Sequence, residues 1–414
     1  MGENYAELRN TLHRRILDKI DLSRDVEDAE ILDLIDEEVI REGQQGTVSL
    51  PERKQLRQEL FYSIRKLDVL QELLDDAGIT EIMINGSEHI FIEENGEIRE
   101  YPQHFVSQDK LEDVIQQIVS ACNRVVNSSS PIVDARLANG SRVSVVLPPV
   151  SLTGPVVTIR RFPEQPIRMP DLLRLGAVSE EIVEFLRTVV RAGYNIFISG
   201  GTGSGKTTFL NALSDFIPEA ERVITIEDNA ELQIRHIPNL VRMETRNANT
   251  EGCAEISIRD LIRCSLRMRP DRIIVGEVRG SESIDMLQAM NTGHDGSMST
   301  GHANSAQDML ARLETMVLMA GLELPLPAVR GQIASGLDLL VHLGRLRDRS
   351  RRLLEIDELG GIADGRITLR TLYRFTEEGE DADGKIRGRW VHEAPLLDRA
   401  KLRSAGLDPA SEAS

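Results

Sequence analysis

The hydrophobic pattern of the first 75 residues predicts helices. Apolar residues recur every four positions, as on one face of a helix, at Leu8, Leu12, Ile16 and Ile20. Residues 31–40 carry a second amphipathic pattern, and Ser49 followed by Pro51 is typical of the start of a third helix. We therefore predict a small helical N-terminal module over residues 1–75.

From residue 81 onwards the apolar positions change to the two-residue period of strands. Four segments alternate in this way: residues 81–85, 89–101, 132–147 and 155–162. Asn-Gly pairs, a strong signal for a hairpin turn, stand at Asn95-Gly96 and Asn139-Gly140. The helical period returns between the strands, over residues 108–126. These elements predict an α+β domain over residues 76–162.

A proline-rich linker over residues 163–171 separates this domain from a second pattern, in which apolar runs alternate with helical segments. Strands are predicted at residues 195–199, 223–227 and 272–277. Helices are predicted after Lys206 and around residues 257–268, 281–290 and 305–320. Such alternation is typical of a parallel-sheet α/β domain, here over residues 172–375.

The C-terminal part of the chain has a different pattern. Two apolar runs beyond about residue 335 predict edge strands, and the acidic, glycine-containing stretch 376–385 predicts a loop. This loop and the tail that follows it form the last predicted region, residues 376–414.

The overall composition narrows the class of protein. The 414 residues include 49 basic and 67 acidic side chains, which gives a net charge of −18. This acidic balance argues against binding to duplex DNA or anionic lipid through bulk charge. Three scattered cysteines exclude a disulfide framework, and no apolar run approaches the roughly 18 residues of a membrane span. We expect a soluble cytoplasmic protein of two or three domains.

Residues 200–207 match the phosphate-binding motif GxxxxGK[ST] directly after a predicted strand and directly before a helix. Glycines let backbone N–H groups surround phosphate oxygens, Lys206 reaches the β- and γ-phosphates, and Thr207 is placed to bind Mg²⁺. The expected nucleotide-binding residues are Gly201, Thr202, Gly203, Ser204, Gly205, Lys206, Thr207 and Thr208. ATP and Mg²⁺ are the predicted ligands.

A carboxylate follows the predicted strand at residues 272–277, as in a Walker B motif. Where a standard P-loop NTPase has an Asp that holds the metal's water shell, this chain has Gly276, followed by Glu277. Glu277 is then placed to orient the attacking water or to accept its proton. The alternative is a glutamate that only caps the next helix.

Two further polar segments belong to the same predicted domain. Glu227, Asp228 and Glu231 enter one loop after a strand, which indicates metal and water positioning near the γ-phosphate or, alternatively, a solvated acidic loop. Residues 291–305 form a predicted loop rich in glycine and hydroxyl groups that contains His302. We interpret His302 as a sensor of the γ-phosphate or an organiser of water, although a structural histidine is the alternative.

Arginines complete the set, because a guanidinium stabilises the charge that develops in phosphoryl transfer. Candidates are Arg142, Arg160 and Arg161 before the linker, and Arg242, Arg246 and Arg279 beside the strands. For any single one, a surface charge is the alternative. We expect one or two of the set to reach a phosphate.

At these motifs the sequence resembles the bacterial secretion ATPase superfamily, which powers type II secretion, type IV pili and type IV secretion. Within it the chain is similar to the CpaF group of tight-adherence (Flp) pilus assembly ATPases. The resemblance covers about residues 60–375. The matching stretches are residues 135–162, 198–218, 225–234, 244–252, 259–280, 285–305 and 312–321. The absence of the usual Asp at Gly276 is the family's own habit.

The resemblance implies a hexameric ring in which an α+β, PAS-like N-terminal domain closes on a RecA-like P-loop domain. It implies Glu277 as the catalytic carboxylate and Glu231 or Glu227 as its helper in the Asp box. His302 is then the histidine of the His box. Residues implied to reach the nucleotide from the N-terminal domain are Arg142, Arg160 and Arg161. Gly301 departs from the branched residue often found before that histidine and suggests a looser loop.

These expectations describe a Mg²⁺-dependent ATPase motor that drives pilus assembly through an inner-membrane platform protein. Association with the membrane would be peripheral, at its cytoplasmic face and through partners. An alternative is a type IV or type II secretion ATPase of another system. A RecA-like nucleic-acid motor is a further alternative, which the net charge of −18 and the 4 % content of aromatic residues disfavour. No nucleic-acid partner is expected.

Overall fold

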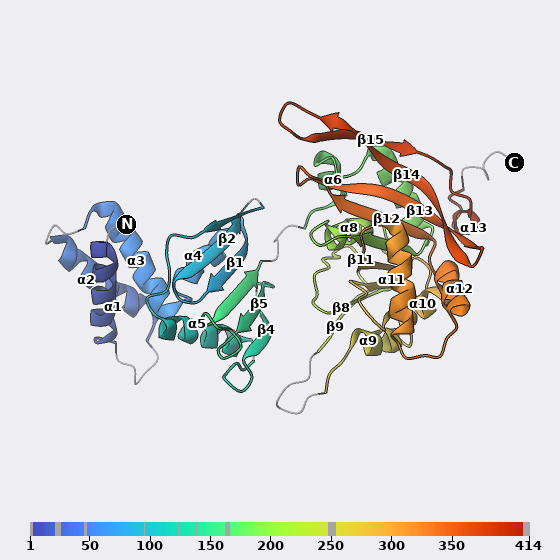
Figure 1. The fold of residues 1–414 in the computed structure, drawn as a ribbon. Coiled ribbons are helices and arrows are strands. Elements are labelled where there is room, and N and C mark those ends of the chain that lie inside the picture. Colours follow the sequence, from blue (N-terminus) through green and yellow to red (C-terminus); the bar gives the residue numbers. More distant parts are fainter. Residues whose placement is uncertain are drawn as a thin grey trace. The chain divides into compact units, whose positions relative to one another are not determined.

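The computed structural model describes residues 3–20, 26–44, 48–94, 96–122, 124–137, 139–161, 166–246 and 254–408. The chain divides into two compact units, Met1–Glu164 and Gln165–Ser414. Figure 1 shows the elements of both units in chain order. Each unit is described by itself.

The first unit begins with a cluster of helices that has its own apolar core. These helices are α1 (Glu3–Leu17), α2 (Asp28–Gln44) and α3 (Leu50–Arg65), and a fourth helix, α4 (Val69–Asp75), packs into the core of the sheet that follows. Fully buried side chains from α1, α2 and α3 are Leu12, Ile16, Ile35, Leu56 and Leu60. Helix α3 begins as predicted after Ser49, whose backbone N–H donates to the Glu52 carboxylate at 2.8 Å.

A six-stranded antiparallel sheet follows in the order β3-β2-β1-β6-β5-β4. Its strands are β1 (Ile79–Asn85), β2 (His89–Glu94), β3 (Glu97–Glu100), β4 (Ile132–Arg136), β5 (Arg142–Val146) and β6 (Val156–Arg160). Alternate residues such as Ile82 and Ile159 are buried under α4 and α5 (Gln108–Ala121) on one face. The predicted turn at Asn95-Gly96 falls between β2 and β3, but Asn95 lies outside the described residues.

The second unit is built on a nine-stranded sheet in the order β15-β14-β13-β12-β7-β11-β10-β8-β9. The strands from β12 to β9 in that order run parallel, and β13, β14 and β15 extend them with antiparallel pairing. The parallel strands are β7 (Ile196–Gly200), β8 (Val223–Glu227), β9 (Leu240–Glu244), β10 (Arg272–Val275), β11 (Met298–His302) and β12 (Leu339–Arg345). The antiparallel strands are β13 (Arg351–Ala363), β14 (Arg366–Glu380) and β15 (Ile386–His392).

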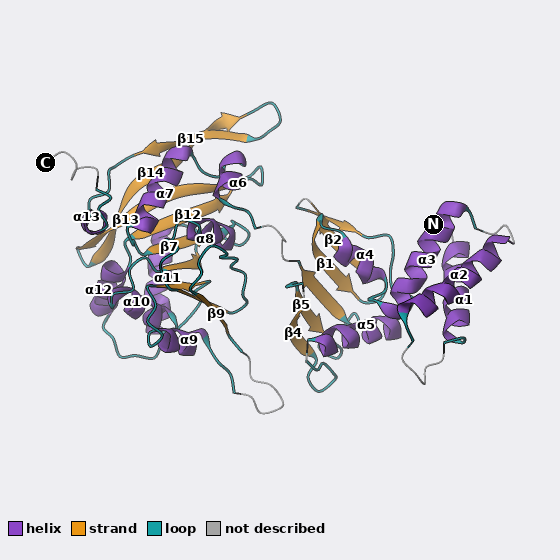
Figure 2. Ribbon diagram, turned by 180° about the vertical axis from the view of Figure 1, so that it is seen from behind, coloured by secondary structure: helices purple, strands orange, loops and turns teal. Residues whose placement is uncertain are grey.

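Helices cover both faces of this sheet, as Figure 2 shows from behind. One face carries α6 (Met169–Arg174), α7 (Glu180–Arg191) and α8 (Lys206–Ser214). The other carries α9 (Ile258–Ser265), α10 (Ser283–Asn291), α11 (Ala306–Leu318) and α12 (Leu326–Gly336). Strands buried on both faces explain the continuous apolar runs of the sequence, such as residues 195–199.

The prediction of a continuous loop over residues 291–305 is wrong for residues 298–302. Residues 298–302 form β11, which lies between β7 and β10 in the middle of the sheet. Serine, threonine and glycine dominate this strand, so no apolar pattern marked it. Gly301 does not loosen the segment. A Cβ there would lie 2.9 Å from the Phe197 ring, so glycine allows β11 to pack closely against its neighbour.

Two predictions for the C-terminal part also need correction. Neither apolar run beyond residue 335 is an edge strand, because the first is β12, between β7 and β13, and the second is β13, between β12 and β14. The loop predicted at residues 376–385 is shorter, because β14 continues to Glu380 through its pairing with β15. Helix α6 begins at Met169, inside the range 163–171 predicted as a linker, and residues 163–165 of that linker lie outside the described part.

The C-terminal segment packs back onto the sheet of the second unit. The Tyr194 hydroxyl donates to the Asp398 carbonyl, and Lys401 bonds to Asp338 at 2.6 Å. The Glu358 carboxylate accepts the backbone N–H groups of residues 397 and 398. A short helix, α13 (Ala400–Ser404), follows, and residues 409–414 of the predicted tail lie outside the described residues. Along the described ranges, none of the helices combines the length and apolar character needed to cross a bilayer.

Candidate nucleotide site

The phosphate-binding motif forms a loop between the central strand β7 and helix α8. Gly203 and Gly205 have φ values of 71° and 93°, a backbone conformation that favours glycine. A Cβ placed on Gly201 or Gly203 would meet nothing within 4 Å. The loop is therefore an open cradle of backbone groups that leads into the N-terminus of α8, where an anion is favoured.

Lys206, the first residue of α8, is buried and points back over this loop. Its Nζ donates to the carbonyls of Gly200 and Gly201 at 3.0 and 2.9 Å. It also lies 3.2 Å from Nδ1 of His302, at the end of β11. Burial lowers the pKa of the Lys206 ammonium. Lys206 is thus held at the mouth of the phosphate loop by groups that a phosphate oxygen is able to replace.

Glu277, which follows β10, lies on the other side of His302. Nε2 of His302 is 2.9 Å from Oε1 of Glu277, and the guanidinium of Arg279 bonds to Oε2 at 2.7 Å. Because Lys206 donates to Nδ1, the imidazole proton belongs on Nε2, but its alignment with Glu277 makes no hydrogen bond, so Oε1 of Glu277 is buried without a hydrogen-bond partner. Burial and the Lys206 charge lower the pKa of His302, which favours this neutral form. Four side chains therefore form one polar chain from the phosphate loop to Arg279.

Glu227 ends β8 and is nearly fully buried beside β10. One carboxylate oxygen accepts the backbone N–H groups of Glu231 and Leu232 at 2.8 and 2.9 Å, and the other has no hydrogen-bond partner. Burial raises the pKa of Glu227 to about 7. A Cβ on Gly276 would lie 2.8 Å from Cγ of Glu227. The glycine in the place of the usual aspartate therefore makes room for a carboxylate from the neighbouring strand.

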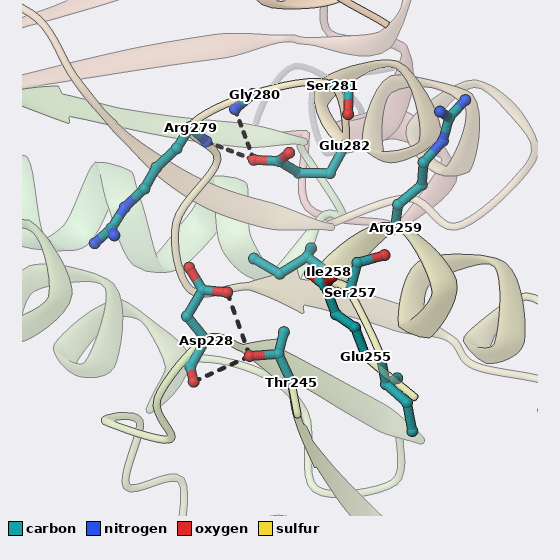
Figure 3. A pocket seen from close by; sticks show the side chains of 11 residues that line it. Asp228, Thr245, Glu255, Ser257, Ile258, Arg259, Arg279, Gly280, Ser281 and Glu282 are labelled. Carbon is teal, nitrogen blue, oxygen red and sulfur yellow. Dashed lines mark hydrogen bonds between the residues drawn. The ribbon is translucent and has the colours of Figure 1, made fainter. Parts of the chain in front are cut away.

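Asp228 borders a cavity of about 400 Å³ next to these residues (Figure 3). Its side chain and backbone carbonyl both lie within reach of the Thr245 hydroxyl, at 3.5 and 3.2 Å. Figure 3 shows Glu282 across the cavity, where it accepts the backbone N–H groups of Arg279 and Gly280. Burial raises the pKa of Asp228. The cavity thus continues the polar site along the carboxyl ends of β8 and β10.

The candidate arginines of the first unit share one end of its sheet. Arg142 pairs directly with Arg160 in the antiparallel register and with Arg136 on its other side. Residues directly opposite each other lie on the same face, here the face away from α5 because Val143 and Ile159 point into the core. Arg161 lies next to Arg160, with its guanidinium 3.4 Å from the Ile79 carbonyl. Their approach to a nucleotide stays a prediction.

The second unit's candidate arginines differ in their surroundings. Arg242 donates to the Leu232 carbonyl and Arg246 to the Ala254 carbonyl, whereas Arg279 contacts the catalytic candidate Glu277. Sequence reasoning missed Arg351, whose Nε donates to the Gly203 carbonyl in the phosphate loop at 2.8 Å. A run of five arginines between residues 345 and 352 of an acidic chain was the available signal.

The residues present fit a nucleotide with Mg²⁺. The glycine cradle and Lys206 suit phosphates, and no described partner engages the Thr207 hydroxyl. The unpaired oxygen of Glu227 is available either as a second oxygen ligand of Mg²⁺, after the Thr207 hydroxyl, or as an acceptor for a water molecule. Within the described ranges, no group of three or more His, Cys, Asp or Glu side chains is arranged to hold a metal by itself.

Comparison with known proteins identifies the family. The family model described as "Type II/IV secretion system protein" matches residues 64–388, more than half of the chain. The chain belongs to this family. A putative conjugal transfer protein of Mycobacterium tuberculosis is 34% identical over 311 residues, which cover 74% of this chain and 87% of that protein.

Other members of the type II/IV secretion family align over similar lengths. The probable conjugal transfer protein TrbB of Sinorhizobium fredii is 35% identical, covering 77% of this chain and 96% of the relative. The type IV secretion system protein PtlH of Bordetella pertussis is 33% identical, covering 70% and 93%.

Solved structures support the fold assignment. The pilus retraction motor PilT with bound ADP has a TM-score of 0.52 and 20% identity, covering 84% of this chain and 88% of that one. The ATPase DotB of Yersinia pseudotuberculosis has a TM-score of 0.51 and 18% identity, covering 72% and 80%. At these identities the likeness concerns the fold alone. It confirms the predicted α/β class, with a RecA-like P-loop domain.

Proposed function

We propose that this member of the type II/IV secretion family is a Mg²⁺-dependent ATPase. The observation that carries the proposal is the polar chain of Lys206, His302, Glu277 and Arg279 beside an open phosphate loop. It combines an anion cradle with a carboxylate that Arg279 holds through Oε2 and whose Oε1 is buried beside His302 without a hydrogen-bond partner. A site that only bound a nucleotide would not require the Glu277 carboxylate with His302 and Arg279 beside it.

In this proposal each residue has a separate task. The loop and Lys206 hold the β- and γ-phosphates. Thr207 and Glu227 bind Mg²⁺ or the water molecules around it. Mg²⁺, when bound, neutralises phosphate charge during transfer. Glu277 orients the attacking water and accepts its proton, because its Oε1 is buried beside the His302 imidazole without a hydrogen-bond partner of its own. His302 links that carboxylate to Lys206 and so reports on whether a phosphate is present.

At the level of the assembly, we infer a homo-hexameric motor that works on a membrane-embedded secretion or pilus platform from the cytoplasmic face. Tight-adherence pilus assembly is the finer proposal, and it rests on the sequence motifs. The names of the relatives, which include two conjugal transfer proteins and a type IV secretion protein, favour a type IV secretion motor as the second candidate. Both candidates share the same ATPase chemistry.

The first experiment measures the Mg²⁺-ATPase rate of the full chain against protein concentration, with the mass followed by light scattering. A rate that rises as a hexamer forms and that ignores single-stranded DNA is the expected result. A monomer that DNA stimulates would contradict the proposal and favour a nucleic-acid motor.

The second experiment tests the role of Glu277. We expect Glu277→Gln to keep ATP binding and to lower the turnover rate by about 10²–10⁴-fold, because the amide no longer accepts the proton of water. Glu180→Gln, an exposed change at the start of α7, is the matched control and should leave the rate unchanged. Turnover of Glu277→Gln at the wild-type rate would remove Glu277 from its proposed role.

A further inference from the structure

The turn between β12 and β13 carries an unusual density of positive charge. Five of the eight residues 345–352, which comprise this turn and the adjoining ends of both strands, are arginines, at positions Arg345, Arg347, Arg349, Arg351 and Arg352, in a chain whose net charge is −18. This turn lies at the carboxyl end of β12, the strand that pairs with β7 as far as Gly200, where the phosphate loop begins. The cluster is therefore next to the nucleotide site of the same unit.

Two of these arginines already have partners within the fold. The guanidinium of Arg347 bonds to the carboxylates of Glu377 and Glu380 on β14. Arg352 donates to the carbonyls of Gly176 and Ile386 and lies over the Phe375 ring. Their charges are thus used in holding the antiparallel strands together.

Arg345 and Arg351 have a different environment. They stand directly opposite each other in the β12–β13 register, so they share one face of the sheet. It is the face of Leu343 and Leu353, which pack in the core beneath α8. Like charges directly opposite each other are destabilising. Among the residues that the structure describes, neither arginine has an acidic partner that would compensate for this repulsion.

The position of Arg351 relative to the phosphate loop is specific. Its Nε donates to the Gly203 carbonyl at 2.8 Å, and its Cδ lies 3.5 Å from the place where a Cβ on Gly205 would be. The side chain therefore runs along the loop, and this single bond leaves its two terminal nitrogens available. A guanidinium binds phosphate oxygens in pairs, which one bond through Nε does not prevent.

We propose that Arg351, assisted by Arg345, binds the phosphates of the nucleotide held by the phosphate loop of the same subunit. The inference rests on the proposed function and extends it, because it names a cation supplied by the C-terminal strands. A bound polyphosphate would place negative charge between the two arginines and relieve their repulsion. The arginines of the first unit, Arg142, Arg160 and Arg161, would then add to a site that already has a guanidinium of its own.

The test is a binding titration of ATP and of pyrophosphate to the full chain. We expect Arg351→Ala to weaken both ligands by about tenfold or more, the usual range for a hydrogen bond to a charged group. Pyrophosphate should be affected as strongly as ATP, because the contact is with phosphate and not with the base. Arg347→Gln, which removes one charge from the same turn but faces β14, should leave both affinities within about twofold.

Arg345→Ala distinguishes ligand binding from a structural brace. Arg345 makes no bond to the phosphate loop, so its loss leaves the contact between Arg351 and Gly203 in place. We expect ATP affinity to fall about threefold or more in this variant. An Arg351→Ala variant that binds ATP as wild type does, or an Arg345→Ala variant without effect, would overturn the proposal. A wild-type chain that binds no ATP would instead refute the proposed function.

Discussion

At the scale of single residues, Glu227 is the carboxylate with the most unusual environment in the site. It is 2% exposed, one of its oxygens has no partner, and its pKa is raised to about 7 by burial. The sequence placed Glu227, Asp228 and Glu231 together as equivalent acids. The structure separates them, because Glu227 points beneath the sheet's edge into the space that Gly276 leaves free.

Glu227 makes stability depend on pH. The folded protein binds this proton more tightly than the unfolded chain, whose Glu titrates near 4.5, so stability falls as the pH rises from about 4.5 to about 7. In Glu227→Gln the amide oxygen still accepts both backbone N–H groups and carries no charge. We expect the variant to gain stability relative to wild type as the pH rises, by up to about 3 kcal/mol above pH 7.

Urea unfolding of the nucleotide-free protein at pH 5 and pH 8 measures this difference. Glu180→Gln, on the exposed surface of α7, serves as the control and should show no such trend. A stability difference between Glu227→Gln and wild type that stays constant across this range would contradict the buried, protonated state of Glu227.

At the scale of elements, β11 is a strand that the pattern of apolar residues could not predict. Strands β7, β8 and β10 were predictable from their continuous apolar runs, and helices α8 and α11 from their helical patterns. Strand β11 was not, because Ser299, Thr300 and Gly301 carry no such signal. Their small size reflects what surrounds them, namely two neighbouring strands and the Phe197 ring, and only tertiary packing reveals that requirement.

A pair of glycine substitutions tests this reading of β11. We expect Gly301→Ala to destabilise the protein by about 1–3 kcal/mol, because its methyl group would overlap the Phe197 ring. Gly331→Ala, in the open interior of α12, should instead stabilise it by about 0.5–1 kcal/mol. Thermal unfolding of both variants gives the comparison. Equal shifts in the same direction would mean that β11 does not pack as tightly as described.

At the scale of the whole molecule, the sequence predicted three side chains that the structure brings together, but it did not predict the strand order that does so. The motifs indicated Lys206, Glu277 and His302, and the structure brings these three side chains together at the start of α8, after β10 and at the end of the neighbouring strand β11. It also adds Arg351, which comes from a part of the chain that matched no motif. The strand order of the sheet, and not any local pattern, brings that residue to the phosphate loop.

The arginines of the first unit give a prediction at this scale. We expect simultaneous change of Arg142, Arg160 and Arg161 to Ala to lower the ATPase rate on the order of 10³-fold while ATP still binds, as for other arginines that stabilise a transferring phosphate. Steady-state turnover and ATP titration separate the two effects. Arg99→Ala, an exposed position on β3, is the control. An unchanged rate in the triple variant would exclude assistance by the first unit.

The strand order also has a consequence for folding while the protein is synthesised on the ribosome. The phosphate loop follows β7, but the two strands that flank β7 are β11 and β12, and Ser199 meets its β12 neighbour His342 across 143 positions of sequence. Parallel strands that are so far apart in the sequence form their pairing late in folding. At typical rates of about 5–20 residues per second, many seconds pass between the emergence of the loop and that of its second neighbour. A chain interrupted before residue 339 therefore displays an apolar strand with an open side, a target for chaperones or for aggregation.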